Sequence, residues 1–174
     1  MIALDVVKAG VALLLASLVQ VSVAGWIEVG EGRPDVVLVV LVAIALLRGP
    51  VYGAVAGFWA GLVLDVASLG TFGLTSLLFT LAGYWAGRFG DVTTRASAHP
   101  PLIAVALASV GVACGSAVLH FMLGESISAA EFFVSVLLPG LALNMLLAYP
   151  LYGLTRRLFP PPLRARRGEV TAAV

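Results

Sequence analysis

Residues 33–65 read RPDVVLVVLVAIALLRGPVYGAVAGFWAGLVLD, and this stretch determines the class of fold. Pro34 stands where the first turn of a helix accepts proline, and an apolar run over 36–47 follows it. The sequence Arg-Gly-Pro at 48–50 breaks the run, and a second apolar run occupies 51–67. Two apolar runs with so short a break between them predict a tight helical hairpin.

The first arm of this hairpin is short for a membrane span. From Pro34 to Leu47 it would extend about 21 Å at the helical rise, against a hydrocarbon core of about 30 Å. The hairpin could cross fully with local thinning of the bilayer, or it could dip in and return. Both alternatives bring the chain back to the side from which it left.

The composition of the whole chain agrees with a membrane protein. Of 174 residues, 61% are hydrophobic and 11% are charged, whereas an ordinary soluble domain has about 25% charged residues. Ten basic and nine acidic side chains could not cover the surface of a soluble fold of this size. These figures exclude a disordered chain, a nucleic-acid-binding protein and an ordinary soluble enzyme.

The apolar runs predict an all-α, polytopic membrane protein with a six-helix bundle. The first run is interpreted as an uncleaved helix rather than a signal peptide, because it is long, Lys8 is its only basic flank and further apolar runs follow. The transmembrane domain is expected over 1–159, with segments at about 6–26, 35–48, 51–67, 72–89, 102–123 and 139–158, before a basic cytoplasmic tail at 160–174.

The basic residues predict the orientation. With the N-terminus in the cytoplasm and six segments, only Arg33 of the ten basic residues falls outside, as the positive-inside rule favours. Both termini are therefore expected in the cytoplasm. The nine residues on that side are Lys8, Arg48, Arg88, Arg95, Arg156, Arg157, Arg164, Arg166 and Arg167.

Small residues recur at intervals of four in three of the segments. This spacing stacks them on one helix face and lets two backbones approach closely, the usual packing device of membrane helices. Packing inside the bundle is the simpler interpretation, and a docking face for a partner helix is the alternative. The glycines concerned are Gly53, Gly57 and Gly61, then Gly83 and Gly87, then Gly111 and Gly115.

Asp65 is the most informative ionisable residue, because a carboxylate within a spanning segment is costly and suggests a function. Its candidate neighbours on the same side are Arg33 and Asp35. The structural interpretation places Asp65 at the outer helix end, accepting hydrogen bonds from the turn at 68–71. The full set of candidate structural or pocket residues is Arg33, Asp35, Arg48, Asp65, Arg88 and Asn144.

Other polar and aromatic residues within the apolar runs suggest packing roles. Asn144 lies deep in the last segment, where its amide could form hydrogen bonds between two helices. Trp26 and Trp85 are candidate interfacial anchors. Trp59 is too central for that role and is expected to pack inside the bundle.

No catalytic, metal-binding or cofactor-binding motif is present in the sequence. There is no nucleophile elbow, no phosphate-binding loop and no pair of intramembrane acids for proton relay. The single cysteine, Cys114, has no partner for a disulfide. The sequence therefore predicts neither an enzyme nor a bound cofactor or metal.

The order of motifs resembles the rod shape-determining protein MreD family. The resemblance rests on Arg33-Pro34-Asp35, Leu47-Arg48-Gly49-Pro50, the Gly53, Gly57 and Gly61 stripe ending in Asp65, Leu69-Gly70, Phe72-Gly73-Leu74, and Gly83-Tyr84 through Ala86-Gly87-Arg88. These motifs cover residues 33–88, and the size and hydropathy profile of the whole chain also fit.

The resemblance implies a non-enzymatic, multi-pass subunit of the bacterial cell-elongation complex in the cytoplasmic membrane. Such a subunit binds MreC directly and works with MreB, RodA and a class B penicillin-binding protein in cell shape and peptidoglycan synthesis. The family is also similar in fold to the S subunits of energy-coupling-factor importers. A vitamin-binding S subunit, or another small membrane transporter, is therefore the alternative function.

Overall fold

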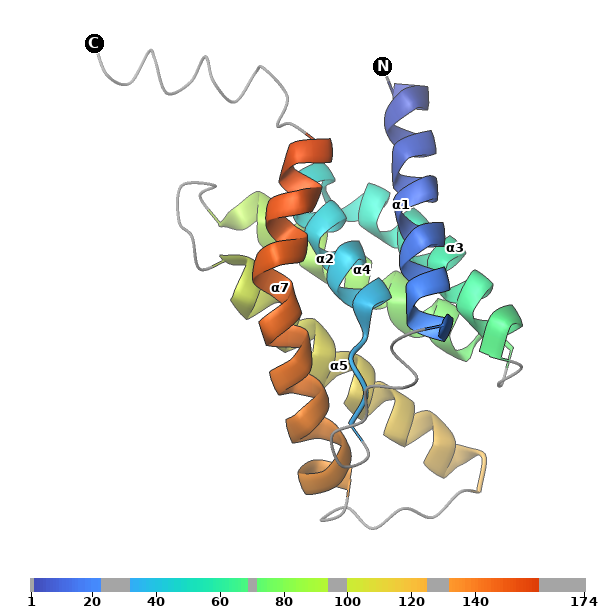
Figure 1. Ribbon diagram of the computed structural model, residues 1–174. Coiled ribbons are helices and arrows are strands. Elements are labelled where there is room, and N and C mark those ends of the chain that lie inside the picture. The colour runs from blue at the N-terminus through green and yellow to red at the C-terminus, as the bar shows by residue number, and fades with distance from the viewer. Residues whose placement is uncertain (1, 23–31, 69–71, 94–99, 125–131, 160–174) are drawn as a thin grey trace.

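A computed structural model describes residues 2–22, 32–68, 72–93, 100–124 and 132–159, and this part of the chain is all-helical (Figure 1), which confirms the prediction of an all-α fold. Its elements are α1 (Ile2–Ser22), α2 (Val36–Arg48), α3 (Pro50–Ser68), α4 (Leu74–Val92), α5 (Pro100–Met122), the π-helix η2 (Phe132–Leu137) and α7 (Leu138–Leu158). The π-helix leads directly into α7, where Pro139 occupies the first turn.

The short helix α2 is the centre of the bundle. It contacts α1, α3, α4, α5 and α7, and every residue from Val37 to Leu46 is buried. A helix without an exposed face needs to be apolar all round, which is why its sequence shows no polar stripe. Its 13 residues span about 20 Å, less than a bilayer core.

Extended backbone continues the path of α2 along the start of α7 (Figure 1). A Cβ atom added to Gly32 would lie 2.6 Å from the backbone nitrogen of Gly140, so these two backbone segments are in contact and leave no room for a side chain at Gly32. Non-helical backbone at membrane depth is tolerated where protein surrounds it. The second segment therefore combines a short helix with an extended entry, an arrangement that the apolar pattern did not predict.

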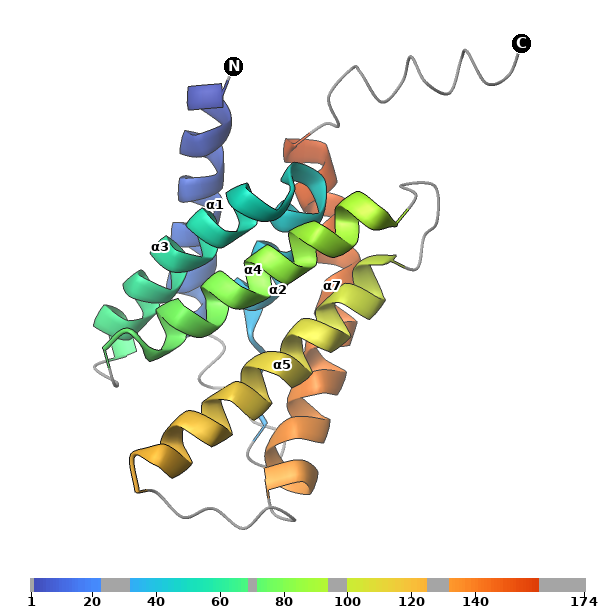
Figure 2. The ribbon, with the colours of Figure 1, turned by 180° about the vertical axis from the view of Figure 1, so that it is seen from behind.

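The helices α3 and α4 have the most extensive contact of any pair of described helices, and they lie side by side in both views (Figures 1 and 2). A Cβ on Gly57 would lie 2.6 Å from the carbonyl carbon of Phe79, and one on Gly61 would lie 2.6 Å from the backbone nitrogen of Ser76. Gly53 and Gly83 face one another across the same contact. The glycine stripe of α3 is thus occupied inside the molecule by the backbone of α4.

The glycines of α5 do not form such a contact. A Cβ on Gly111 would have no described atom within 4 Å, and one on Gly115 would meet only the side chain of Leu78. The prediction of close packing inside the bundle is therefore wrong at this stripe, while a docking face for a partner helix stays a prediction. The glycine spacing shows where two helices could approach closely. Here the neighbouring helix α4 contacts α5 through the side chain of Leu78 rather than through its backbone.

Two of the three tryptophans, Trp59 and Trp85, are exposed on the surface of the bundle. Trp59 is 60% exposed, so the prediction that it packs inside the bundle is wrong. Its face of α3 points outward because the opposite face carries the glycine stripe that packs against α4. Trp85 is 65% exposed, while Trp26 lies outside the described residues.

The bundle has the features of a multi-pass membrane protein. Four described helices are long and apolar enough to cross a bilayer, at Asp5–Ser22, Pro50–Ser68, Pro101–Met122 and Val134–Leu158. The start of α1 and the end of α7 lie at the same end of the bundle (Figure 1). Six crossings remain a prediction, because α2 is shorter and α4 is not among those four spans in the described part of the chain.

Candidate functional site

A cluster of polar side chains surrounds the start of α2. The backbone N–H of Val36 donates to Oε1 of Gln20 at 2.7 Å, and the N–H of Asp35 donates to Oδ1 of Asn144 at 2.7 Å. The N–H of Leu38 donates to Oδ1 of Asp35 itself at 3.0 Å. These side chains supply partners for donors that the first turn of any helix leaves without a partner of its own.

Asn144 links this cluster to the rest of the bundle. Its Nδ2 donates to Oγ of Ser109 at 3.0 Å, so one buried amide on α7 joins α5 to the start of α2. In the described part of the chain, every buried side-chain polar atom has a hydrogen-bond partner. Both polar atoms of the Asn144 amide therefore have partners within the bundle, as expected for a residue deep in the last segment.

A pocket of about 360 Å³ opens beside the cluster. Gln20, Arg33 and Asp35 line it together with Ser68 and Thr75 from the α3–α4 hairpin. Arg33 and Asp35 were predicted as neighbours of Asp65, but Asp65 is not among the residues that line this pocket. Gln20 and Asp35 already accept hydrogen bonds from α2, which leaves less of their polar capacity for a ligand.

Asp65 caps the helix that follows its own. Its carboxylate accepts from the backbone N–H groups of Gly73 at 2.8 Å, Thr75 at 3.1 Å and Ser76 at 3.2 Å. Gly73 is the N-cap residue of α4 and has no side chain to cap it, so Asp65 supplies the carboxylate from α3. This arrangement is the structural interpretation of Asp65, with donors just beyond the predicted turn, whose residues 69–71 lie outside the described part.

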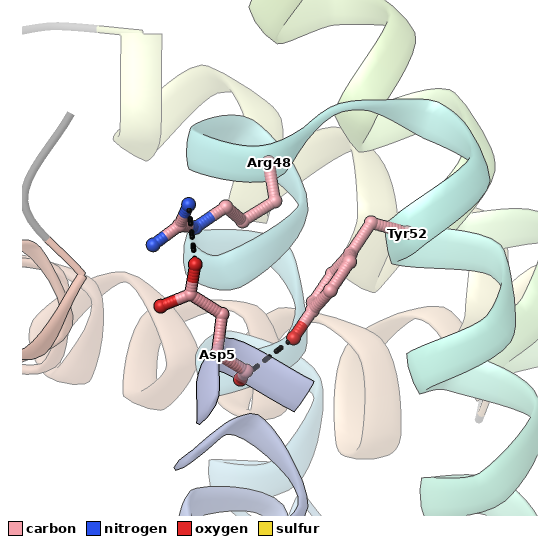
Figure 3. A network of polar contacts seen from close by, with 3 residues as sticks. All are labelled: Asp5, Arg48 and Tyr52. Atoms are coloured by element: carbon pink, nitrogen blue, oxygen red, sulfur yellow. Dashed lines mark hydrogen bonds and ion pairs between the residues drawn. The ribbon is translucent and has the colours of Figure 1, made fainter. Parts of the chain in front are cut away.

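A second polar cluster joins three elements at the opposite end of α2 (Figure 3). Arg48 Nη1 lies 3.1 Å from Oδ2 of Asp5, and the hydroxyl of Tyr52 donates to the backbone oxygen of Asp5 at 2.8 Å. The guanidinium of Arg48 also lies 5.5 Å from the ring centre of Phe159. These contacts fix the start of α1 and the end of α7 to the turn between α2 and α3.

The sequence pointed to Arg48 but not to its partners. Asp5 precedes the first apolar run and Tyr52 follows the Arg-Gly-Pro break, so the two lie 47 positions apart. An acidic residue beside an apolar run was the available signal, because a membrane-embedded arginine needs a countercharge. Arg88, by contrast, is an exposed residue of α4 and belongs to neither cluster of the described chain.

Two lateral grooves lie between neighbouring helices. The α1–α3 groove, of about 650 Å³, has a floor of Ala9, Gly10, Ala56 and Ala60. The α4–α5 groove, of about 640 Å³, has a floor of Ala82, Ala86, Ala104 and Ala108. Both are lined mainly by apolar side chains, which suits acyl chains or another membrane helix.

The polar side chains of these sites mainly hold the described helices together. The described residues contain no group of three histidine, cysteine or acidic side chains that could hold a metal ion. The buried polar groups named above bind backbone atoms or one another, and the larger cavities are apolar. The fold and its sites define a multi-pass helical membrane protein whose polar residues hold its own helices together.

Comparison with known proteins gives this class a family. The chain matches the family model of the rod shape-determining protein MreD over residues 5–160. This match covers nearly the whole chain, so the protein belongs to the MreD family, as the motifs at 33–88 predicted. Curated proteins and solved structures gave no significant match.

Proposed function

We propose that this protein is a non-enzymatic subunit of the rod complex in the bacterial cytoplasmic membrane. In this proposal it binds MreC directly and, with MreB, RodA and a class B penicillin-binding protein, supports peptidoglycan synthesis and cell shape. The family match over 5–160 is the observation that carries the proposal.

The α1–α3 groove is the surface that we assign to the membrane helix of MreC. Its floor of alanine and glycine lets a second helix approach closely, which is how helices associate in lipid. Arg48 lies at one end of this groove, but Asp5 compensates its charge. An apolar helix entering here would therefore meet little uncompensated charge.

Gly10→Leu tests this assignment without disturbing the bundle. A Cβ at Gly10 would have none of the described atoms within 4 Å, so the new side chain fills the groove rather than the fold. We expect Gly10→Leu to abolish co-purification with MreC while the melting temperature stays unchanged. Gly111→Leu is the matched control, since it fills the α4–α5 groove under the same condition.

Two results would contradict the assignment. Retention of MreC by Gly10→Leu would exclude the α1–α3 groove, and loss of MreC from Gly111→Leu alone would move the interface to the α4–α5 groove. Absence of any MreC association with the unmodified protein would remove the proposed function itself.

The proposal includes an orientation with both termini in the cytoplasm and an even number of crossings. The shared end of α1 and α7 supports it, together with the positive-inside distribution of basic residues. A reporter fused after Leu163 should be active in the cytoplasm, and one inserted at 124–131 should be active in the periplasm. A periplasmic C-terminus would overturn this orientation.

The vitamin-importer alternative receives less support. Its best feature is the 360 Å³ pocket lined by Gln20, Arg33 and Asp35. Two of those side chains are already bound to the start of α2, and the family match does not favour a transporter. We therefore do not propose solute binding as the function.

A further inference from the structure

The α4–α5 groove has a cationic residue on its wall. Arg88 lines it from α4, one turn from the end of that helix, and Trp85 stands beside it. The guanidinium is exposed, and no ion pair or hydrogen bond links it to another described residue. The groove thus combines an apolar length with a positive charge near one end.

The α1–α3 groove provides an internal comparison. It has nearly the same volume and also contains an arginine, Arg48. There the guanidinium lies 3.1 Å from Asp5 and packs over Phe159, so its charge is compensated within the fold. The two grooves therefore differ in electrostatics rather than in size, and only the α4–α5 groove offers an exposed cation to an external anion among the described residues.

The part of the groove between Leu78 and Arg88 has about the length of one leaflet of a bilayer, and Phe89 and Val92 continue the lining beyond Arg88. Ten residues of α4 separate Leu78 from Arg88, which is about 15 Å at the helical rise and half of a hydrocarbon core of about 30 Å. The lining of α5 from Ala104 to Gly115 has a similar length. An acyl chain running along the floor would therefore place its headgroup at the level of Arg88.

The charged end of the groove lies at the end of the bundle where α2 turns into α3. Gly87, next to Arg88, packs against Pro50, so Arg88 is level with the Arg48 end of the bundle. Trp85 is exposed at the same level, where an indole ring favours the headgroup region. In the proposed orientation this is the cytoplasmic leaflet, and the groove itself does not depend on that assignment.

We propose that the α4–α5 groove binds an anionic phospholipid, with an acyl chain on its floor and the phosphate paired with Arg88. A basic side chain between membrane helices is the recognised element of such sites. A zwitterionic lipid brings its own cation to the headgroup and competes with the guanidinium, whereas phosphatidylglycerol does not. We expect phosphatidylglycerol to bind about five-fold more tightly than phosphatidylcholine, the effect of one basic residue beside an anionic headgroup.

Tryptophan quenching by brominated lipids measures this preference directly. One variant keeps only Trp85, through Trp26→Phe and Trp59→Phe, and reports on the α4–α5 groove. The other keeps only Trp59, through Trp26→Phe and Trp85→Phe, and reports on the α1–α3 groove. Each is reconstituted in phosphatidylcholine with the same mole fraction of either brominated phosphatidylglycerol or brominated phosphatidylcholine.

We expect the phosphatidylglycerol preference at Trp85 and not at Trp59. Arg88→Gln should remove it, while Arg157→Gln, which deletes an exposed charge of α7 outside the groove lining, should leave it unchanged. Gly111→Leu keeps Arg88 but fills the floor, so it should also remove the preference. MreC co-purification should survive Arg88→Gln, which separates this inference from the proposed function.

Three outcomes would overturn the inference. Equal quenching of Trp85 by the two lipids would show that the groove does not select charge. A preference that persists in Arg88→Gln, or falls equally in Arg157→Gln, would show that general surface charge is responsible. No quenching of Trp85 by either lipid would show that protein, either a second copy or a partner helix, covers the groove.

Discussion

Replacing Gly57 by alanine adds one methyl group where two helix backbones meet. The new Cβ would lie 2.6 Å from the carbonyl carbon of Phe79 and 3.0 Å from the nitrogen of Thr80. Carbon atoms prefer a separation of about 3.5–4.0 Å, so α3 and α4 would have to part by roughly 1 Å. The atoms in the way are backbone, which cannot rotate aside as a side chain would.

The cost follows from the length of the contact. A gap of about 0.5–1 Å forfeits a quarter to a half of the dispersion energy of each affected atom pair. Overpacking typically costs about 1–3 kcal/mol, and we expect Gly57→Ala to fall at the upper end because Gly53 and Gly61 lie in the same contact. The free energy of unfolding should be measured by titration with sodium dodecyl sulfate in mixed micelles.

Gly111→Ala is the matched control for the glycine stripe. It makes the same change in another helix, where the added Cβ would meet none of the described atoms within 4 Å. Its unfolding free energy should be unchanged or slightly raised, because alanine favours a helix by up to about 1 kcal/mol over glycine. Equal stabilities of Gly57→Ala and Gly111→Ala would refute the close-contact reasoning.

The pair Gly53 and Gly83 offers a sharper test of the same geometry. A Cβ on either residue would meet the backbone of the other, so one separation of α3 from α4 relieves this shared clash for both methyl groups. The Cβ on Gly53 would also lie 2.6 Å from Cβ of Ala45 on α2, a clash that the separation does not relieve. The double alanine variant should therefore cost clearly less than the sum of the two single variants. Additive costs would indicate that each site relaxes independently of the other.

Three further experiments test the polar contacts, each by the same unfolding titration. Asp65→Asn keeps the shape of the side chain but replaces the carboxylate that accepts from three N–H groups at the start of α4. It should lower the free energy of unfolding by about 1.5–3 kcal/mol, and an unchanged stability would exclude the capping role. Asn144→Ala should cost about 1–3 kcal/mol, since it strips the N–H of Asp35 and the hydroxyl of Ser109 of a partner; a loss below a few tenths would contradict this. Arg48→Gln and Asp5→Asn should show a coupling energy of about 1 kcal/mol in a double-mutant cycle, and strict additivity would remove the ion pair.

The helix pattern of this chain was predictable because lipid enforces it. Every backbone polar group in a bilayer needs a partner within the protein, so apolar runs of this length have to be helical. The central position of α2 was not predictable, since an apolar helix reads the same whether lipid or protein surrounds it. Its short length was the one available signal that extended backbone precedes the helix and that side chains of other helices bind its first N–H groups.

Individual polar residues were recognisable in kind, but their partners were not. The depth of Asn144 indicated a hydrogen bond between helices, whereas its acceptance from Asp35 depends on where the start of α2 is buried. For Asp65, the sequence left a functional and a capping role open, and the glycine at the N-cap of α4 accounts for the contacts observed. The prediction for Trp59 was wrong because a central position in an apolar run indicates depth in the membrane and not which side of the helix faces away from the bundle.

The hydrogen bond between the N–H of Asp35 and the amide of Asn144 also sets an order of biosynthesis. The two residues are 109 positions apart, so the ribosome completes α2 long before it produces its partner on α7. The neighbouring α3 and α4 can dock as soon as both emerge. At the start of α2, Gln20 of α1 is present early to bind Val36, whereas Asp35 receives its partner only with the last helix. We therefore expect Val36→Cys to react faster with a water-soluble maleimide in a nascent chain halted before α7 than in the finished protein, where this position is half-buried.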